Sequence, residues 1–534
     1  MKAKKPYKTP LWGIGLYLLI LASMSQGMEL KKVAIIGGGP AGLVSAKEFK
    51  ALGHDVTLFE SSAQIGGQWN SNNKRSAVWN SLNMNTPRHM IEFSDFSWDD
   101  VVPPTSGYSG TFPPHRESQQ YLLAYVKNFG LEDHIKTNHE IVAVKKNADA
   151  SWEVEFEINS QEGESIANSQ TFDMVIFATG MFTKANRPLD QKGGPLEEYR
   201  GKIIHSHDFK TIDMADVKDQ TVMVIGNGIS GTEIATEMVR AGAKEVIHSI
   251  RKPHYHINTY RQDRPTETLE ETFFQRFPVI LGRYLPQSLN SEGLKKAVLE
   301  AFPLQLDADI LGSEWVLDGN VDKAGVALSR HNYVEDVHQG KVLLQKIPVG
   351  ATADELIFPG NERKQFDLVI MATGYSLDIP FLSDEVKKDI VVKGRNDLVL
   401  YNHVLHPSEA TLAFVGFKDF VGAVWPAVEM EARYAARALS GMVNLPSQDK
   451  IQQEMVKIRA SKKLAGAHIV ASHVQEDLGD LLGITPSLLQ CLVNPSKYLF
   501  ACLYPCSYRT SAALDDASTV TEAAEKWEKY RALK

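Results

Sequence analysis

The chain has 534 residues, of which 43% are hydrophobic and 23% charged, a composition that is ordinary for a globular protein. At about 150 residues per domain, this length predicts roughly three to four domains or fewer large ones. Lysine and arginine number 57 against 65 for aspartate and glutamate, so the net charge of -8 gives no electrostatic reason to expect nucleic acid. All cysteines (Cys491, Cys502, Cys506) lie near the C-terminus, which excludes a disulfide scaffold, a cysteine-based zinc site and a CxxC redox pair.

Residues 1–27 have the pattern of a signal peptide or signal anchor. Lysines in the first eight residues precede an apolar run from Leu11 to Ala22, and small or polar residues follow. The apolar run is short for a bilayer span. The alternative is an extension without function, with the folded protein starting near Met28. The leader favours the secretory pathway or membrane association, and a start near Met28 favours the cytoplasm, so the compartment stays open.

The first motif that carries chemistry is a glycine-rich turn after an apolar strand. Residues 33–36 predict a buried strand, and Gly37, Gly39 and Gly42 follow in GxGxxG spacing. These glycines allow a tight turn, close approach of the backbone to a pyrophosphate, and close packing of the next helix. A second strand ends at Glu60, a carboxylate suited to accept hydrogen bonds from a ribose. The full set predicts a dinucleotide site.

The same pattern recurs at residues 221–231, TVMVIGNGISG. Gly226, Gly228 and Gly231 again follow an apolar strand and open a helix. The next strand, residues 245–250, is followed by Arg251 instead of a carboxylate. Because a cation at this place pairs with a 2′-phosphate, the sequence predicts a preference for NADP over NAD. The alternative is that Arg251 is simply a solvated strand end.

Two glycine turns in one chain predict two dinucleotides, FAD and a nicotinamide. Residues 172–180 (FDMVIFATG) and 366–375 (FDLVIMATGY) each end an apolar strand with Ala-Thr-Gly. They are similar to the paired links where the chain passes between the two domains of two-dinucleotide flavoproteins. Two ordinary parallel strands with glycine turns are the alternative.

Several further segments make the resemblance to one family specific. Residues 199–209 read YRGKIIHSHDF, residues 66–69 read GGQW, and residues 84–90 read MNTPRHM. In these motifs, and in residues 366–380, the chain resembles the flavin-containing monooxygenases over roughly residues 31–530. It departs from them in having tyrosine where their first motif usually begins with phenylalanine. The phenylalanine that ends that motif, Phe209, favours oxygenation of heteroatoms over Baeyer–Villiger chemistry.

The resemblance implies FAD and NADPH as cofactors. It assigns catalysis to Asn85, whose amide would donate toward the reacting part of the flavin and help to position the nicotinamide; an Asn-Thr-Pro turn is the structural alternative. No metal site is expected. The predicted cofactor-binding residues are Gly37, Gly38, Gly39, Pro40, Ala41, Gly42, Glu60, Gln68, Trp69, Asn85, Thr86, Gly226, Gly228, Ser230, Gly231, Thr232, Glu233 and Arg251.

Four other residues invite a functional interpretation. His205 lies in the family motif, and we expect it to pack or hydrogen-bond there rather than to transfer protons. His254 and His256 suggest a metal by their spacing, but a solvated loop is expected instead. For Arg433, a contact with a nucleotide and an ion pair on a helix are both left open.

The activity that the resemblance implies is an NADPH- and O2-dependent monooxygenase. It would oxygenate soft nucleophilic nitrogen or sulfur atoms of small molecules through an FAD C4a-hydroperoxide. In such an enzyme the protein binds, orients and shields the cofactor, and the site must be dry. The alternatives are a Baeyer–Villiger-type ketone monooxygenase, an uncoupled NADPH oxidase that releases hydrogen peroxide, and a nucleotide-binding protein without turnover. The sequence indicates neither the substrate nor the oligomeric state.

The predicted fold is α/β, with two Rossmann-like dinucleotide-binding domains and a helical C-terminal tail. The NADP-binding domain is inserted in a split FAD-binding domain. The expected boundaries are 31–200 and 340–445 for the FAD-binding domain, 201–339 for the NADP-binding domain with a variable insertion, and 446–534 for the tail.

One stretch of the tail, residues 481–502, is apolar but interrupted by Pro486 and Pro495. It cannot form one straight membrane helix. Association with a membrane surface and packing in a core are both left open for it.

Overall fold

The structure is a computed structural model, which describes residues 29–88, 91–102, 112–159, 165–252, 254–258, 260–261, 264–265, 326–329, 333–392, 397–460 and 469–485. The leader-like residues 1–27, the three cysteines and residues 486–534 lie outside these ranges, so the predictions made for them stay predictions. Among the helices in the described ranges, none is both long and apolar enough to cross a membrane.

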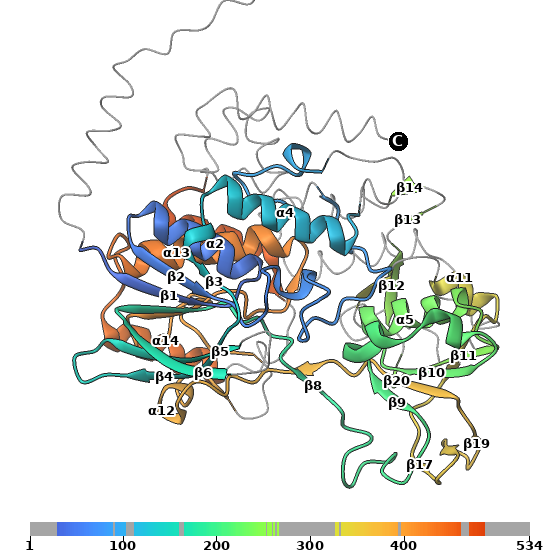
Figure 1. Cartoon of the computed structure of the whole chain (residues 1–534). Coiled ribbons are helices and arrows are strands. Elements are labelled where there is room, and N and C mark those ends of the chain that lie inside the picture. Colours follow the sequence, from blue (N-terminus) through green and yellow to red (C-terminus); the bar gives the residue numbers. More distant parts are fainter. Residues whose placement is uncertain are drawn as a thin grey trace, which may run out of the picture.

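A five-stranded parallel sheet forms the centre of one lobe of the molecule, which we call the first lobe (Figure 1). Its strand order is β22 (Leu412–Phe414), β7 (Met174–Phe177), β1 (Lys32–Ile36), β2 (Asp55–Phe59) and β3 (Ile135–Lys136). The central strand β1 is buried on both faces, as a parallel strand covered on each side must be, and this explains its almost continuous apolar sequence.

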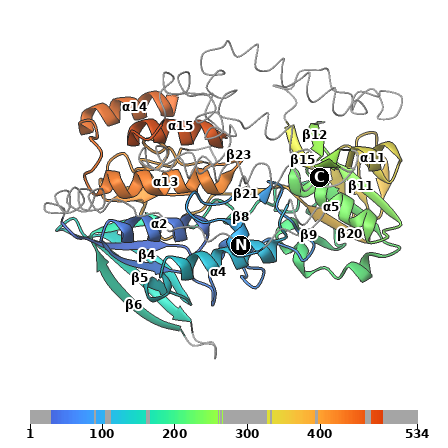
Figure 2. The same ribbon diagram turned by 90° about the horizontal axis from the view of Figure 1, so that it is seen from above.

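The two faces of this first sheet are covered differently. Val33 and Ile35 of β1 point into a core with α2 (Pro40–Ala51), α4 (His115–Asn128) and α13 (Val424–Leu439). Ala34 and Ile36 face the other side, which is covered by an antiparallel sheet. That sheet consists of β4 (His139–Lys146), β5 (Trp152–Asn159) and β6 (Ser165–Phe172). In Figure 2, α2 and α13 lie side by side, with α14 (Gln448–Ala460) and α15 (Ala471–Leu482) beyond them.

A second five-stranded parallel sheet lies in the other lobe of Figure 1. Its order is β16 (Val342–Gln345), β11 (Glu245–Ser249), β10 (Thr221–Ile225), β20 (Leu368–Met371) and β9 (Ile203–His205). On one face it packs against α5 (Ile229–Arg240) and α11 (Tyr333–His338), through side chains such as Val224 and Met238. The predicted α/β fold with two parallel sheets is confirmed.

Short elements complete the described chain. Antiparallel β8 (Lys184–Ala185) and β21 (Tyr375–Ser376) form the crossing between the two lobes. The other strands are β12 (Tyr255–Asn258), β13 (Tyr260–Arg261), β14 (Arg264–Pro265), β15 (Val326–Ser329), β17 (Gly350–Ala351), β18 (Leu356–Ile357), β19 (Arg363–Lys364), β23 (Phe420–Val421) and β24 (Ile469–Val470). The short helices are η1 (Gly67–Trp69), η3 (Trp98–Asp100), η4 (Glu132–His134), η5 (Ser206–Thr211), η6 (Met214–Val217) and α12 (Asp384–Lys387).

The expected domain boundaries at Arg200 and Gly340 differ from the observed topology. β16 and β20 follow Gly340 in the chain but belong to the second sheet. Tyr199, placed before the first boundary, packs in a core with Met223 of β10. The chain therefore leaves the first lobe at β8 and returns at β21. The sequence does not show which sheet a strand joins, because strand order in a parallel sheet need not follow chain order.

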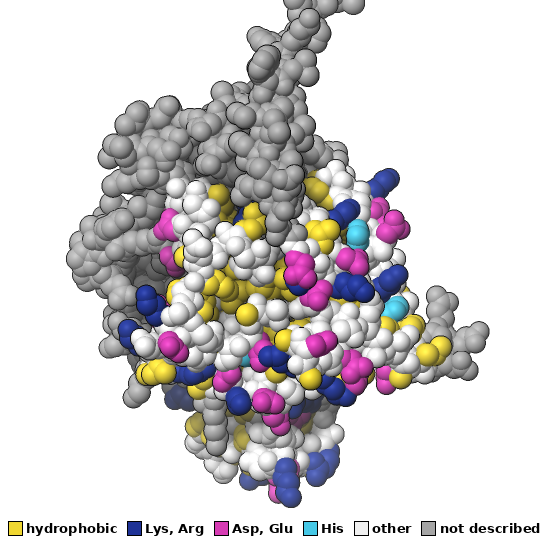
Figure 3. All heavy atoms as spheres, turned by 90° about the vertical axis from the view of Figure 1, so that its left-hand side faces the viewer, with side chains coloured by type: hydrophobic (Ala, Val, Ile, Leu, Met, Phe, Trp, Pro, Cys, Tyr) yellow, Lys and Arg dark blue, Asp and Glu magenta, His cyan; other side chains and the backbone are white. Residues whose placement is uncertain are grey.

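The surface carries charges of both signs. On the face shown in Figure 3, basic and acidic side chains of the described residues are interspersed, with apolar side chains between them. The net negative charge of the chain is thus not concentrated in one patch on this face.

Candidate functional site

Two positions of the first glycine turn, Gly37 and Gly42, require glycine. Gly37 has a φ of 113°, and a Cβ placed on it would lie 2.5 Å from the carbonyl oxygen of Ala178. A Cβ on Gly42 would lie 1.8 Å from the carbonyl oxygen of Gly37. Both contacts are far below van der Waals distance, so the turn is as tight as its GxGxxG spacing predicts.

The turn leads into α2, whose N-terminus is open to a ligand. Gly39 caps this helix without a side-chain hydrogen bond, and Pro40 begins it. The GGQW motif lies directly against the turn, because the Gly66 N–H donates to the Gly38 carbonyl at 2.9 Å and a Cβ on Gly67 would lie 2.9 Å from the Gly39 Cα. Backbone without side chains on both sides, next to the first N–H groups of a helix, fits the pyrophosphate of a dinucleotide.

Glu60 lies at the end of β2, where a ribose-binding carboxylate is expected, but it also braces the turn. One oxygen, Oε2, accepts the Gly38 N–H at 2.7 Å, and the other, Oε1, accepts the N–H and hydroxyl of Ser62 at 2.8 and 2.7 Å. The side chain is buried. Glu60 therefore fixes the backbone of the glycine turn in addition to any contact with a cofactor.

The remaining residues predicted to touch FAD belong to the segment between η1 and α4. The Gln68 side chain donates to the Arg75 carbonyl and accepts from the Ala77 N–H. It therefore stabilises the conformation of the loop that follows it. Trp69 meets the edge of Trp425, at 6.3 Å between ring centroids. The Asn85 Oδ1 accepts the hydroxyl of the buried Thr86 at 3.4 Å. Asn85 itself is half-buried.

The second glycine turn repeats the geometry of the first. Gly226 has a φ of 121°, and its Cβ would lie 2.3 Å from the carbonyl oxygen of Ala372. A Cβ on Gly231 would lie 1.8 Å from the Gly226 carbonyl oxygen, whereas a Cβ on Gly228 would meet no atom of the described part of the chain within 4 Å. Gly228 caps α5 without a side-chain bond, so this helix N-terminus is also open. Both Ala-Thr-Gly segments thus back onto a glycine turn.

The residues predicted to contact NADP around this turn divide by exposure. Ser230 and Arg251 are exposed, whereas Thr232 and Glu233 are buried. The Thr232 hydroxyl donates to the Ile229 carbonyl within the helix. By strand register Ile250, not Arg251, occupies the position that Glu60 has in the first lobe. Arg251 follows it at the surface.

The histidines singled out from the sequence have different surroundings. His205 is buried, its Nδ1 accepts the His207 N–H at 3.1 Å, and its ring meets the edge of Tyr375. This is the packing and hydrogen-bonding environment expected for it, and burial lowers its pKa. The prediction of a solvated loop is wrong for His256, which is buried with its ring 4.8 Å from that of Tyr333. Among the described residues, no group of three or more His, Cys, Asp or Glu side chains could hold a metal ion.

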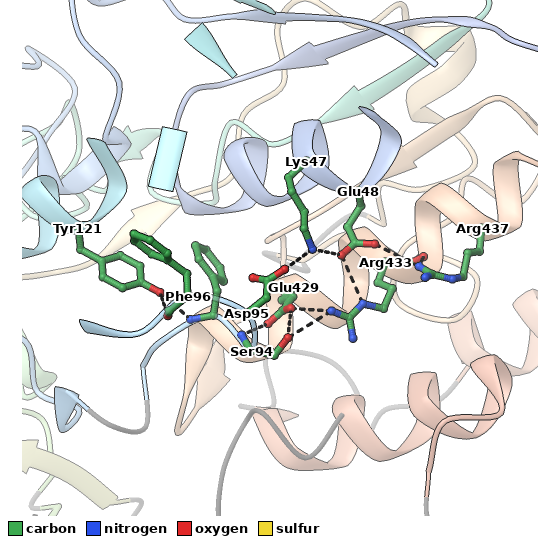
Figure 4. Close-up of polar contacts among 10 residues, drawn as sticks. Lys47, Glu48, Ser94, Asp95, Phe96, Tyr121, Glu429, Arg433 and Arg437 are labelled. Atoms are coloured by element: carbon green, nitrogen blue, oxygen red, sulfur yellow. Dashed lines mark hydrogen bonds and ion pairs between the residues drawn. The ribbon is translucent and has the colours of Figure 1, made fainter. Parts of the chain in front are cut away.

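Arg433 belongs to a buried network of charges between α2 and α13 (Figure 4). Its guanidinium pairs with Glu429 at 2.7 Å and with Glu48 at 3.4 Å. Glu48 also binds Lys47 and Arg437, and Lys47 reaches Asp95. Although burial opposes ionisation, Arg433 and the neighbouring cations lower the pKa of Glu48 to about 2. Of the two interpretations of Arg433, the structure shows the ion pair.

Glu431 is a buried group that the sequence did not single out. Its Oε2 accepts the Gly416 N–H at 2.7 Å. Gly416 follows β22 and lies next to α2, since a Cβ on it would lie 3.1 Å from the Ala41 Cβ. Burial raises the pKa of Glu431 to about 8, so the side chain is mostly a neutral acid at pH 7. No sequence pattern marks it, because its surroundings come from three separate segments.

Two glycine turns of this kind, one on each parallel sheet, define a protein that holds two dinucleotides. The model of a known family, described as flavin-binding monooxygenase-like, matches residues 30–512 of this chain. The chain therefore belongs to that family. As a member, it is an FAD-dependent monooxygenase that uses NADPH and O2 on a small-molecule substrate. The predicted family, enzyme class and cofactors are confirmed.

Known proteins are similar in sequence to most of this chain. Flavin-containing monooxygenase 5 of Cavia porcellus is 31% identical over 503 residues, which cover 90% of this chain and 88% of the relative. N-oxide-forming dimethylaniline monooxygenase 2 of the same species is 26% identical, with 89% and 87% covered. The solved structure of S-allyl-L-cysteine S-oxygenase from Allium sativum superposes with a TM-score of 0.61 at 22% identity, covering 94% of this chain and 99% of that one. The last likeness concerns the fold.

Proposed function

We propose that the enzyme oxygenates soft nucleophilic nitrogen or sulfur atoms of small molecules, with FAD on the first glycine turn and NADPH on the second. The observation that carries this assignment is the pair of matching turns, each closed by a glycine whose Cβ would lie 1.8 Å from a backbone oxygen. The names of the relatives, which include an N-oxide-forming enzyme, support the choice of heteroatom. Phe209, buried at the end of the family motif, supports it as well.

The bound cofactors supply hydride transfer and the activation of O2. The residues of this chain bind and shield them. The N-termini of α2 and α5 would receive the pyrophosphates, and Glu60, which holds the first turn in shape, would bind the adenosine ribose. Arg251 carries the charge that distinguishes a 2′-phosphate from a hydroxyl.

Shielding from water falls to an aromatic cluster behind the GGQW motif. Trp425 stacks on Phe93 and Trp98 with ring centroids 5.6 and 5.8 Å apart, and its edge meets Trp69. Tyr121 closes the cluster on the ring of Trp98 at 4.3 Å. A wall of this kind offers few hydrogen-bond partners to water, as an oxygenating flavin requires. We assign the half-buried Asn85 to the reacting centre.

An Asn85→Ala variant should lose product while it keeps FAD. Removal of one positioned donor at a reacting centre typically costs about 100- to 1000-fold in rate. Wild-type and variant enzyme are compared under air by NADPH consumption, hydrogen peroxide, and oxygenated product from a tertiary amine or a thioether. Exposed Asn72 provides a matched control, and Asn72→Ala should behave like the wild type. Unchanged product formation in Asn85→Ala would remove Asn85 from the mechanism.

The same assay tests the proposed function itself. Wild-type enzyme should form one oxygenated amine or thioether for each NADPH consumed. Peroxide equal to the NADPH consumed would identify an uncoupled oxidase instead. An ester formed from a ketone, with no oxidation of the amine or thioether, would identify the Baeyer–Villiger alternative.

An Arg251→Ala variant should raise the KM for NADPH by about 10- to 100-fold, the usual effect of losing charge-assisted hydrogen bonds to a phosphate. The KM for NADH should change little, since NADH lacks the 2′-phosphate. Steady-state kinetics with both coenzymes measures this directly. Arg240 at the far end of α5 is half exposed and serves as the control. Equal changes for NADPH and NADH would show that Arg251 does not recognise the 2′-phosphate.

A further inference from the structure

Two successive peptide groups of the second glycine turn are held by histidine side chains. The Gly226 carbonyl accepts a hydrogen bond from His248 Nε2 at 2.8 Å. The next carbonyl, that of Asn227, accepts one from His254 Nδ1 at 2.9 Å. The Asn227 side chain in turn donates to the Lys252 carbonyl at 2.9 Å. β11 and the segment that follows it therefore fix the backbone of the turn.

His248 is itself fixed from behind. It is fully buried in β11, and its Nδ1 lies 2.5 Å from the hydroxyl of buried Tyr333 on α11. Because a carbonyl only accepts, Nε2 must carry the proton, and Nδ1 must accept from the Tyr333 hydroxyl. Burial lowers the pKa of His248 to about 4, so the ring stays neutral in this tautomer at physiological pH. The helix α11 and the strands β10 and β11 that supply these contacts lie together in Figure 1.

The first glycine turn has no such contact at the matching place. In the second sheet His248 pairs in register with Val224, and in the first sheet the corresponding pair is Leu58 with Ile35. Leu58 is buried and apolar, as a strand of a parallel sheet favours. A buried histidine with both nitrogens engaged costs more to place there than a leucine, so its contact with the turn calls for a functional reason.

The direction of these bonds suggests that reason. In a trans peptide the C=O and the following N–H point in opposite directions. Holding the Gly226 and Asn227 carbonyls toward the histidines turns the N–H groups of Asn227 and Gly228 away from them. Successive N–H groups that face one side at a helix N-terminus form a site for an anion. Gly228 is exposed, and among the described residues no atom would lie within 4 Å of a Cβ on it, so a ligand can approach this turn closely.

We propose that His248, supported by Tyr333, is a positioning residue for NADPH. It fixes the Gly226 peptide so that the following N–H groups face the pyrophosphate of the nucleotide. His254 acts in the same way on the next peptide. This inference rests on the assignment of the second turn to NADPH in the proposed function.

Three replacements of His248 separate positioning from mere packing. His248→Gln keeps an amide donor that reaches the Gly226 carbonyl, His248→Asn keeps a polar group near Tyr333 but falls short of Gly226, and His248→Leu keeps neither. The Kd of NADP+ is measured by calorimetry on the oxidised, FAD-loaded enzyme, together with KM and kcat for NADPH. We expect Kd and KM to rise about tenfold in the Leu and Asn variants, with kcat nearly unchanged, and to stay within about threefold of wild type in the Gln variant.

His406 supplies the matched control. It is also buried, and its Nε2 donates to the Val386 carbonyl at 3.1 Å, but it lies in the first lobe. His406→Leu should lower Tm without changing the affinity for NADP+. FAD content should be the same in all His248 variants, because the first turn is untouched.

The outcomes are distinct. Wild-type affinity for NADP+ in His248→Asn or His248→Leu would overturn the proposal, and so would an equal loss in the Gln and Asn variants. If the Leu variant does not fold, the comparison of Asn with Gln decides. Wild-type enzyme that binds no NADP+ at all would instead refute the assignment of the second turn, which is a failure of the proposed function.

Discussion

A Gly42→Ala variant is expected to lose at least nine-tenths of its bound FAD. The added methyl group would lie 1.8 Å from the Gly37 carbonyl oxygen, and Gly37 is itself held at a positive φ against Ala178. The turn can admit the methyl only by opening, which moves the α2 N-terminus away from the pyrophosphate. The flavin-to-protein ratio, read from the absorption spectrum of the purified variant, measures the loss. Circular dichroism reports whether the parallel sheets persist.

Two variants in the second turn serve as controls for Gly42→Ala. Gly231→Ala meets the same 1.8 Å contact with the Gly226 carbonyl, so it should retain FAD and lose NADP+ binding. Gly228→Ala should fold normally, because the methyl meets no atom of the described residues within 4 Å, and any loss of NADP+ binding would then come from contact with the nucleotide. Full FAD content in Gly42→Ala would contradict the placement of FAD on the first turn.

Replacing Arg433 with methionine is expected to lower Tm by about 5–10 °C. The change leaves Glu429 without its 2.7 Å partner and weakens the compensation of Glu48, and both carboxylates are buried. Leaving a buried charge uncompensated costs roughly 3–5 kcal/mol of the free energy of unfolding. Because the network joins α2 to α13, the variant should also release FAD more readily on warming. Thermal unfolding followed by circular dichroism and by flavin fluorescence measures both effects.

The controls for Arg433→Met test whether the loss of stability comes from an uncompensated buried charge. The double variant Glu429→Gln with Arg433→Met removes both members of the pair and should recover part of the lost Tm. Arg75→Met breaks an exposed ion pair with Glu140 of 2.5 Å and should change the free energy of unfolding by less than about 1 kcal/mol. A Tm for Arg433→Met equal to that of Arg75→Met would show that the buried network does not stabilise the fold.

The network also explains how a residue with an ambiguous sequence context acquires its role. Arg433 and Glu429 are one helical turn apart, which by itself indicates a solvated pair on a helix surface. Only the docking of α13 on α2 buries the pair and adds Glu48 to it. His256 is a similar case, since a solvated loop is expected for it from the sequence and the ring of Tyr333 packs against it in the fold.

The sequence by itself determined the two dinucleotide turns of this protein, their strands and the family. These features are local: a glycine is required where a Cβ would strike a backbone atom a few residues away, as at Gly42 and Gly231. Tertiary structure decided what distant segments contribute. It placed β16 and β20 in the second sheet, put Tyr333 behind His248, and buried Glu431 beside Gly416. Such contacts depend on strand order and helix docking. They cannot be predicted from the sequence, because neither leaves a periodic pattern in the chain.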